Sequence, residues 1–367
     1  MKKINLKKNV LLASLIASIP LASPFVIKAS SALTGSVVML SFVEKVHANE
    51  RSDFYFDRAF NKAENGDSAG AIVDYTKSIE IDPNKVAYYN RALSKQKLND
   101  FSGAIADYTK AIELDPEYAD AYLNRGFVKK TGLRDYAGAL IDYKKAAEVD
   151  PNDSLAYNNI GLTKDELGEY SGAIPYFTKA IELDPNQPDY YYSRARSKSF
   201  LGDNKGAISD YTKAIKIDPK YTNAYVNRGL AKSNLGNQSG AMDDYNKALK
   251  IDPNMAITYY NRGIVKYDLE DYSGAVIDYT KAIEIDGAYT NAYLNRGFVK
   301  DHELKDHIGA IIDYTKAIEI EPDNVLVYYN RGIAKGNLDD MEGACSDWRK
   351  ASYLGDEDAA EFVKEDC

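Results

Sequence analysis

Few side chains in this sequence have the type and spacing that catalysis or metal binding requires. Of three histidines, His302 and His307 lie five residues apart, so they do not share one helix face as the i, i+4 ligands of a helical metal pair do. Acidic residues are abundant but recur at fixed positions, as expected for solvated helix faces and caps and not for one tuned carboxylate pair. The sequence has no glycine-rich phosphate loop. We therefore expect no catalytic residue, no metal site and no cofactor.

A recurring arginine and a recurring aspartate form a polar constellation along the chain. The arginines are Arg58, Arg91, Arg125, Arg194, Arg228, Arg262, Arg296 and Arg331, and the aspartates are Asp74, Asp107, Asp142, Asp210, Asp244, Asp278, Asp313 and Asp347. One segment lacks both, with Ile160 and Tyr176 in their places. Because the two charges disappear together, we expect ion pairs such as Arg228–Asp244, since a guanidinium fork suits a partly buried carboxylate. The alternative is that the arginines form a track for an anion.

The elements that would position these residues recur in units of 33 to 35 residues. The nine letters AYLNRGFVK occupy 121–129 and return at 292–300, and an alanine marks the same place in every unit: Ala71, Ala104, Ala139, Ala173, Ala207, Ala241, Ala275, Ala310 and Ala344. Small and aromatic residues fall at helical spacing, which indicates two helices per unit. An Asp-Pro such as Asp252-Pro253 closes the unit, because the residue before a proline avoids helical geometry.

This pattern resembles that of the tetratricopeptide repeat (TPR) family, W-x2-L-G-x2-Y followed by A-x3-F and a proline. An aromatic takes the first place, Gly or Ala the next, and the A-x3-aromatic and proline follow, as in Tyr88, Ala92, Ala104, Tyr108 and Pro116. The family leucine is replaced by the recurring arginine, and the tyrosine four residues later by lysine, for example Lys129 and Lys300. The resemblance covers about residues 52–355 and implies an all-α fold, an α-solenoid wound as a right-handed superhelix of about nine helix-turn-helix repeats. The expected repeats are 52–85, 85–118, 119–153, 154–187, 188–221, 222–255, 256–289, 290–324 and 325–355.

In the resembled family, the first helix of each repeat lines a groove that takes partner proteins. Carried over by position, the resemblance implies a lining of Phe56, Phe60, Tyr89, Asn90, Asn124, Phe127, Asn227, Tyr260, Asn261, Tyr267, Asn295, Phe298, Tyr329 and Asn330. Interleaved acids are Asp53, Glu64, Asp120, Asp165, Glu166, Asp189, Asp268 and Asp301. Such a surface suits an extended peptide with basic and apolar residues. The alternative for each aromatic is packing against the next repeat. The Lys and Arg of the family's carboxylate clamp are missing, which leaves the asparagines to bind peptide backbone.

The first 48 residues have the outline of an export signal, with four lysines among the first eight residues and apolar stretches at 10–27 and 32–43. We expect cleavage before Asn49, with an uncleaved membrane anchor at residues 1–48 as the alternative. Either outcome places the remaining chain outside the cytoplasm, in a periplasm, a lumen or the exterior. The net charge is −9, and removal of these residues, which carry six Lys and one Glu, would leave −14. An acidic chain is not expected to bind nucleic acid.

The two cysteines, Cys345 and Cys367, lie near the C-terminus. In an exported protein they are expected to form a disulfide that ties a capping helix at 356–367 to the last repeat, although two independent thiols are the alternative. Taken together, these observations predict a non-enzymatic scaffold that holds a partner protein or extended peptide. The alternative is a structural envelope or cell-surface spacer whose groove holds no ligand.

Overall fold

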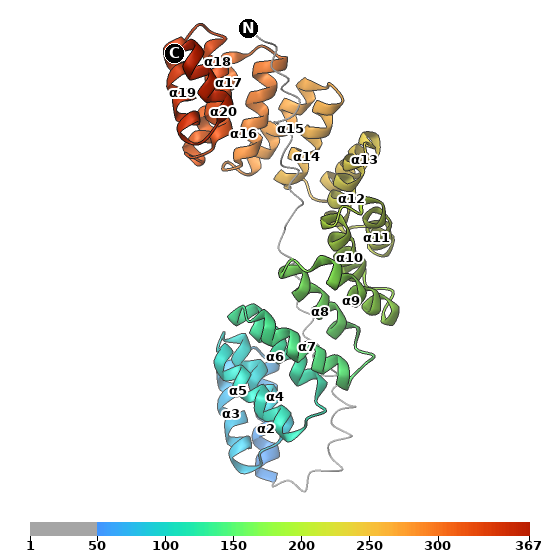
Figure 1. Cartoon of the computed structure of the whole chain (residues 1–367). Helices are drawn as coiled ribbons and strands as arrows, with labels where there is room; N and C mark the ends of the chain where they lie inside the picture. The colour runs from blue at the N-terminus through green and yellow to red at the C-terminus, as the bar shows by residue number, and fades with distance from the viewer. Residues whose placement is uncertain (1–49) are drawn as a thin grey trace. The chain divides into compact units, whose positions relative to one another are not determined.

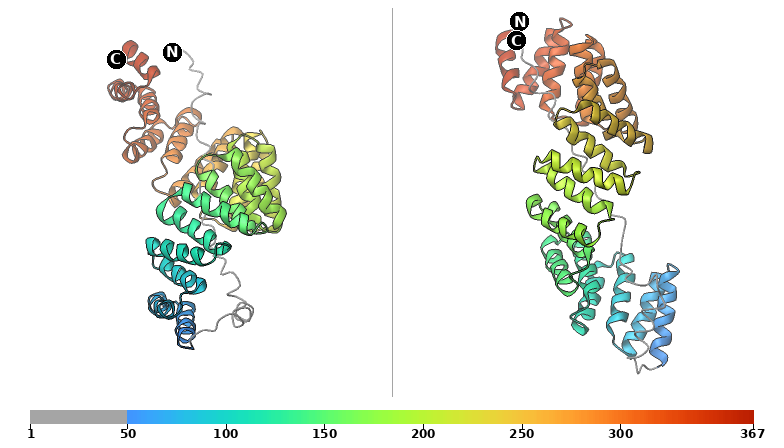
Figure 2. Two further views of the ribbon diagram at one scale, coloured as in Figure 1. Left: turned by 60° about the horizontal axis from the view of Figure 1, so that its bottom comes forward. Right: turned by 90° about the vertical axis from the view of Figure 1, so that its right-hand side faces the viewer.

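The computed structural model describes residues 50–367, which consist of helices and the turns that join them. These residues form two compact units, 50–203 and 204–367. Within each unit, pairs of helices lie side by side and are joined by short turns (Figures 1 and 2). The predicted all-α fold of about nine helix-turn-helix repeats is confirmed. The leader predicted for residues 1–48 lies outside the described residues. From residue 50 onward, no helix has both the length and the apolar character that a membrane span needs.

The unit at residues 50–203 contains four helix pairs and one further helix. Its helices are α2 (Glu50–Glu64), α3 (Ser68–Ile81), α4 (Lys85–Lys97), α5 (Phe101–Leu114), α6 (Ala119–Leu133), α7 (Tyr136–Val149), α8 (Ser154–Glu166), α9 (Tyr170–Leu183) and α10 (Pro188–Phe200). The second helix of each pair also packs against the first helix of the next repeat, so the apolar core is continuous within the unit.

The unit at residues 204–367 begins with α11 (Asn204–Ile217) and continues in the same alternating order. It contains α12 (Thr222–Asn234), α13 (Gln238–Ile251), α14 (Ala256–Asp268), α15 (Tyr272–Ile285), α16 (Thr290–Phe298), the π-helix η3 (Val299–Glu303), α17 (His307–Ile320), α18 (Val325–Gly336), α19 (Met341–Tyr353) and α20 (Glu357–Asp366). The last helix, α20, packs against α19 and covers the end of the stack.

Most second helices of a repeat begin at an aspartate cap followed three residues later by glycine. At α5, the Asp100 carboxylate accepts a hydrogen bond of 2.9 Å from the backbone nitrogen of Gly103. A Cβ at Gly103 would lie 2.1 Å from a carboxylate oxygen of Asp100, so this capped turn requires glycine. The same cap opens α3, α7, α15, α17 and α19. The aspartates of the Asp-Pro pairs end these helices in extended geometry, as at Asp115 and Asp252.

Small residues on the first helix allow close approach of an aromatic ring from the second. A Cβ at Gly126 would lie 2.9 Å from the ring of Tyr143, which is fully buried. The same contact joins Gly229 to Tyr245 and Gly263 to Tyr279. This packing explains why the repeat needs glycine or alanine on one helix and a large ring on the other.

The two copies of the nonapeptide lie in helices that end differently. The first lies wholly within α6, whereas the second ends inside the π-helix η3. Both belong to repeats with one extra residue. At the end of α6 the backbone N–H of Asp135 bonds to the carbonyl of Lys129, six residues earlier, whereas the equivalent bond from Asp100 to Lys95 spans five. In η3 the extra residue widens the helix, so that Leu304 donates its backbone N–H to the carbonyl of Val299, five residues earlier.

Candidate functional site

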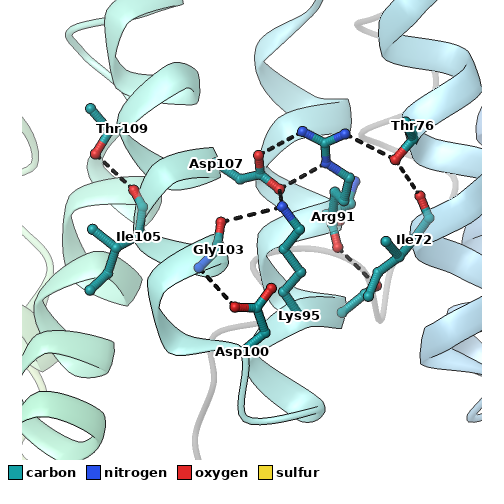
Figure 3. A network of polar contacts seen from close by, with 11 residues as sticks. Ile72, Thr76, Arg91, Lys95, Asp100, Gly103, Ile105, Asp107 and Thr109 are labelled. Carbon is teal, nitrogen blue, oxygen red and sulfur yellow. Dashed lines mark hydrogen bonds and ion pairs between the residues drawn. The ribbon is translucent and has the colours of Figure 1, made fainter.

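Most of the recurring arginines join an aspartate of their own repeat to a side-chain oxygen of the preceding repeat, which is usually a threonine hydroxyl. Arg91 on α4 donates from Nε and Nη2 to the two oxygens of Asp107 at 2.8 and 2.7 Å, and from Nη1 to Oγ1 of Thr76 at 3.0 Å (Figure 3). Lys95, four residues later, reaches the same carboxylate at 2.8 Å. The buried Asp107 is therefore held by two cations, and Thr76 extends the network to α3.

This network recurs in both units. Arg228 reaches Asp244 at 2.9 and 2.6 Å and Thr212 at 3.0 Å, while Lys232 reaches Asp244 at 2.7 Å. Equivalent contacts are made by Arg58, Arg125, Arg262, Arg296 and Arg331. The sequence indicated the arginine–aspartate contact but not the part played by lysine or threonine, although a lysine four residues after the arginine position occurs in every repeat.

The carboxylates of this network are acceptors for two cations, which leaves little free positive charge for an anion track. In the first repeat, the hydrogen bond from Arg58, assisted by Lys62, lowers the pKa of Asp74 to about 2. Most of these arginines also lie over the tyrosine three residues earlier, as Arg262 does over Tyr259 at 5.4 Å. These contacts assign the arginines to structure.

The repeat at α8 and α9 lacks the network and has a different polar contact. Here Lys164 pairs with Glu169 at 2.5 Å in place of an aspartate. Asp165 is buried and accepts a hydrogen bond of 2.7 Å from Oγ of Ser197 on α10, while its Oδ2 has no hydrogen-bond partner within residues 50–203. Burial raises the pKa of Asp165 to about 6.

Five of the residues implied as groove lining are half-buried and reach solvent: Phe56, Phe60, Asn90, Phe127 and Tyr267. The other nine are buried among neighbouring helices, namely Tyr89, Asn124, Asn227, Tyr260, Asn261, Asn295, Phe298, Tyr329 and Asn330. Two acids expected on the same surface, Asp165 and Asp301, are also buried, so the expectation that they face a groove is wrong. Binding of a partner by the remaining residues stays a prediction.

Two of the buried asparagines, Asn124 and Asn295, are held by a tyrosine of the preceding repeat. Nδ2 of Asn124 donates to the hydroxyl of Tyr89 at 2.8 Å, and Nδ2 of Asn295 donates to the hydroxyl of Tyr260 at 3.1 Å. The partners lie 35 residues apart in both cases. We call such a contact a closed rung.

Asn261 on α14 occupies the same place as Asn124 and Asn295 but makes no such contact. The residue 35 positions earlier is Val226, which has no hydroxyl. Asn261 is 2% exposed, and neither its Nδ2 nor its Oδ1 has a hydrogen-bond partner within residues 204–367. A buried amide with both groups unsatisfied is costly unless something else completes it. We call this position the open rung.

The open rung borders a cavity of 190 Å³. The cavity is lined by Leu230, Ser233, Asn234, Tyr245, Asn261, Ile264 and Asp268. The lining therefore combines apolar and polar side chains, and Asp268 is exposed to solvent. The sequence resemblance pointed to Asn261 but gave no reason to separate it from the other asparagines. The signal that distinguishes it is the valine at position 226.

The histidines gather around one buried carboxylate. Asp301 in η3 is fully buried, and its Oδ1 lies 2.5 Å from Nδ1 of His307, while Oδ2 lies 3.5 Å from Nε2 of His302. Burial lowers the pKa of His302. Among residues 50–367, no three acidic, histidine or cysteine side chains are placed to hold a metal ion. This cluster fixes the turn between η3 and α17.

The C-terminal cysteines meet at the end of the second unit. Cys345 on α19 and Cys367 are joined by a disulfide, with their Cα atoms 5.6 Å apart. The bond lies at the far end of α20 from its cap at Asp356, and the ring of Phe362 on α20 stacks on Trp348 at 4.7 Å. The terminal helix is thus held to the last repeat by a covalent bond and by ring packing.

Comparison with known proteins identifies the repeat. A family model described as TPR repeat matches residues 96–131, 201–236 and 234–269, and models described as Tetratricopeptide repeat match 154–187, 256–289 and 290–324. Together these matches span more than half of the chain. No curated protein matches the sequence.

Solved structures share the fold. A tetratricopeptide repeat protein from Parabacteroides merdae is 19% identical, with 69% of this chain and 97% of that chain covered and a TM-score of 0.51. The Cut9–Hcn1 hetero-tetramer of APC/C gives 14% identity, coverage of 85% and 75%, and a TM-score of 0.51. YrrB, described as a TPR protein with an unusual peptide-binding site, is 26% identical over 50% of this chain and 95% of its own, with a TM-score of 0.45.

Proposed function

Because this chain belongs to the tetratricopeptide repeat family, we propose that it is a non-enzymatic scaffold that binds an extended segment of a partner protein, anchored at the open rung of Asn261. TPR scaffolds typically serve protein–protein interaction, and the proposal assigns the contact to a particular cavity in the unit at residues 204–367. The observation that carries it is the buried, unsatisfied amide of Asn261 at the edge of a 190 Å³ cavity.

The chemistry of the cavity matches a peptide. The Asn261 amide offers one donor group and one acceptor, which is the set that a peptide backbone N–H and C=O require. Leu230 and Ile264 supply apolar wall. A cavity of about 150 Å³ holds a benzene-sized group, so this one has room for an aliphatic or small aromatic side chain. Asp268 at the edge favours a basic residue next to the apolar anchor.

The N-terminal segment and the disulfide bear on where the chain acts. We propose that residues 1–48 direct export and that the repeats act outside the cytoplasm, where the Cys345–Cys367 disulfide is stable. Mass spectrometry of protein isolated from its native source is expected to show an N-terminus at Asn49 and no free thiol. Intact residues 1–48 in a membrane fraction would indicate the anchor instead, and reduced cysteines would contradict export.

The binding site is tested by closing the open rung. A random peptide library displayed on phage is selected on the full-length protein, and the enriched peptides are titrated against variants. Val226→Tyr introduces the phenol that closes the other rungs, so it is expected to pair with Asn261 and abolish binding while thermal stability is retained. Asn261→Ala is expected to weaken binding at least about tenfold.

Asn295→Ala is the matched control, because Asn295 lies in a closed rung, where its amide is already bonded to Tyr260. It is expected to leave peptide affinity unchanged. If Val226→Tyr and Asn261→Ala bind the selected peptides as well as the unaltered protein does, the site is wrong. If no peptide is enriched, the spacer function, with no ligand, is favoured.

A further inference from the structure

A lysine and a glutamate three residues apart form a surface pair on five of the second helices. The pairs are Lys110–Glu113 on α5 at 2.6 Å, Lys145–Glu148 on α7 at 2.7 Å, Lys179–Glu182 on α9 at 3.5 Å, Lys281–Glu284 on α15 at 2.6 Å and Lys316–Glu319 on α17 at 2.6 Å. Each pair leaves its helix surface locally neutral.

Two neighbouring second helices break this rule in the same way. On α11 the pair is Lys213 and Lys216, and on α13 it is Lys247 and Lys250, so the glutamate is replaced by lysine in both. All four side chains are exposed, and none of them has an acidic partner within 4 Å in the unit at residues 204–367. Four lysines without an acidic partner thus stand on a chain whose net charge is −9.

The two lysine pairs lie on helices that are joined by one arginine. Arg228 on α12 bridges the two helices, with Nη1 on Thr212 of α11 at 3.0 Å and Nη2 on Asp244 of α13 at 2.6 Å. Lys213 follows Thr212 directly, and Lys247 lies one turn beyond Asp244. Lys213 and Lys216 thus lie on one of the two bridged helices, and Lys247 and Lys250 lie on the other; we call these four residues the lysine face.

An open depression of 680 Å³ adjoins the lysine face. It is lined by Tyr225, Arg228, Lys232, Asp243, Asp244, Asn246, Lys247 and Lys250, which amounts to four basic and two acidic side chains. The carboxylate of Asp244 is already shared by Arg228 and Lys232. The donors of Lys247 and Lys250 remain for a ligand.

We propose that the lysine face of α11 and α13 binds a carboxylate-rich segment of a partner protein, at a surface distinct from the Asn261 cavity. The extent of the patch favours a short acidic segment over a nucleic acid. Binding of nucleic acid requires an extended basic face, whereas α15 and α17, further along the same unit, carry Glu284 and Glu319 at the places of Lys216 and Lys250. A long polyanion would meet these acids, but a short acidic segment would not.

The proposal is tested with a fluorescein-labelled oligoglutamate peptide and the full-length protein. Binding followed by fluorescence anisotropy is expected at low ionic strength and to weaken as salt is added. The double variant Lys216→Glu and Lys250→Glu recreates the Lys–Glu pair found on five other helices, so it is expected to fold as before. Its affinity for the peptide is expected to fall at least about tenfold.

The matched control is Lys281→Glu with Lys316→Glu, which changes the net charge equally but lies on α15 and α17. It is expected to retain most of the affinity. Equal losses in both double variants, or no binding of oligoglutamate to the unaltered protein, would overturn the proposal. Tighter binding of a single-stranded oligonucleotide or of phosphatidylserine vesicles than of oligoglutamate, abolished by the Lys216 and Lys250 changes, would also overturn it and assign the face to that class of ligand.

Discussion

The repeat of α12 and α13 and the repeat of α14 and α15 have the same scaffold contacts and different surface chemistry. Arg228–Asp244 and Arg262–Asp278 are equivalent ion pairs. The first helix of each repeat differs at the rung position, where α12 has Val226 and α14 has Tyr260. Asn261 therefore has no partner from the preceding repeat, whereas Asn295 is held by Tyr260.

The two repeats thus keep the same ion-pair framework while they differ at the rung position and on the outer face of the second helix. The arginine, lysine, aspartate, glycine and buried tyrosine keep the helices in register in both repeats, so they are not available for variation. The outer face of the second helix is exposed, whereas the rung position is part of the core but holds valine in one repeat and tyrosine in the other. They are where these two repeats diverge.

The largest expected effect tests whether the framework is equivalent in both repeats. Asp244→Ala and Asp278→Ala should each destabilise the protein by about 3–5 kcal/mol, because each leaves an arginine and a lysine without their shared carboxylate. Urea unfolding followed by circular dichroism measures the loss. Asp243→Ala, an exposed neighbour without an ion pair, is the control and should change stability by less than about 0.5 kcal/mol. Unequal losses of stability in Asp244→Ala and Asp278→Ala would show that the two ion-pair frameworks are not equivalent.

In the repeat of α8 and α9, which lacks the ion-pair framework, stability should fall as pH rises. This is opposite to the effect of an aspartate such as Asp74, whose pKa is lowered by its ion pairs. The folded pKa of Asp165 is about 6 and its unfolded pKa is about 4, so the folded state binds the proton more tightly and stability falls as pH rises from about 4 to 6. The difference between these two pKa values corresponds to a loss of stability of up to about 3 kcal/mol above pH 6. Asp165→Asn should therefore stabilise the protein above pH 6 and have little effect below pH 4. Thermal unfolding over this pH range measures it, and a variant less stable than the unaltered protein at pH 7.5 would contradict the account.

The closed and open rungs should differ in stability when their amides are removed. Asn295→Ala breaks a buried hydrogen bond to Tyr260 and should cost about 1 kcal/mol, and Tyr260→Phe should cost a similar amount. Asn261→Ala removes an amide that has no partner and should be neutral or stabilising. Equal losses for Asn261→Ala and Asn295→Ala in urea unfolding would show that the open rung is satisfied after all.

The smallest effect concerns the outer face. Lys250→Glu should stabilise α13 by about 0.2–0.5 kcal/mol by forming an i, i+3 pair with Lys247, and Glu284→Lys should destabilise α15 by a similar amount. High salt should reduce both changes because these side chains are exposed. If Lys250→Glu and Glu284→Lys changed the free energy of unfolding in the same direction, the two positions would not be equivalent and this account of the outer face would be contradicted.

Much of the framework could be predicted from the sequence because it is periodic. The spacing of alanine, tyrosine and Asp-Pro predicted the helix pairs. The joint loss of charge at Ile160 and Tyr176 predicted the contact between arginine and aspartate. The lysine's place on the same carboxylate was not predicted, although its position was known, because spacing alone does not show which way a long side chain turns.

The rungs depend on a contact between residues 35 positions apart, in two different repeats. Whether an asparagine there is satisfied is decided by a single hydroxyl on another helix, and the local sequence of Asn261 resembles that of Asn124 and Asn295. The burial of Asp301 was missed for a related reason. Asp301 and Asp165 occupy the same place in their first helices, five residues after the arginine position, and each is covered by a side chain of a later helix, His307 for Asp301 and Ser197 for Asp165.

The most direct test of the account is the side-chain amide resonance of Asn261 in a ¹⁵N NMR spectrum, assigned by its loss in Asn261→Ala. On titration with a phage-selected peptide, this resonance is predicted to shift with the binding curve, while the side-chain amides of Asn124 and Asn295 stay in place. A bound peptide that leaves the Asn261 resonance unmoved would contradict the proposal that the open rung is the anchor.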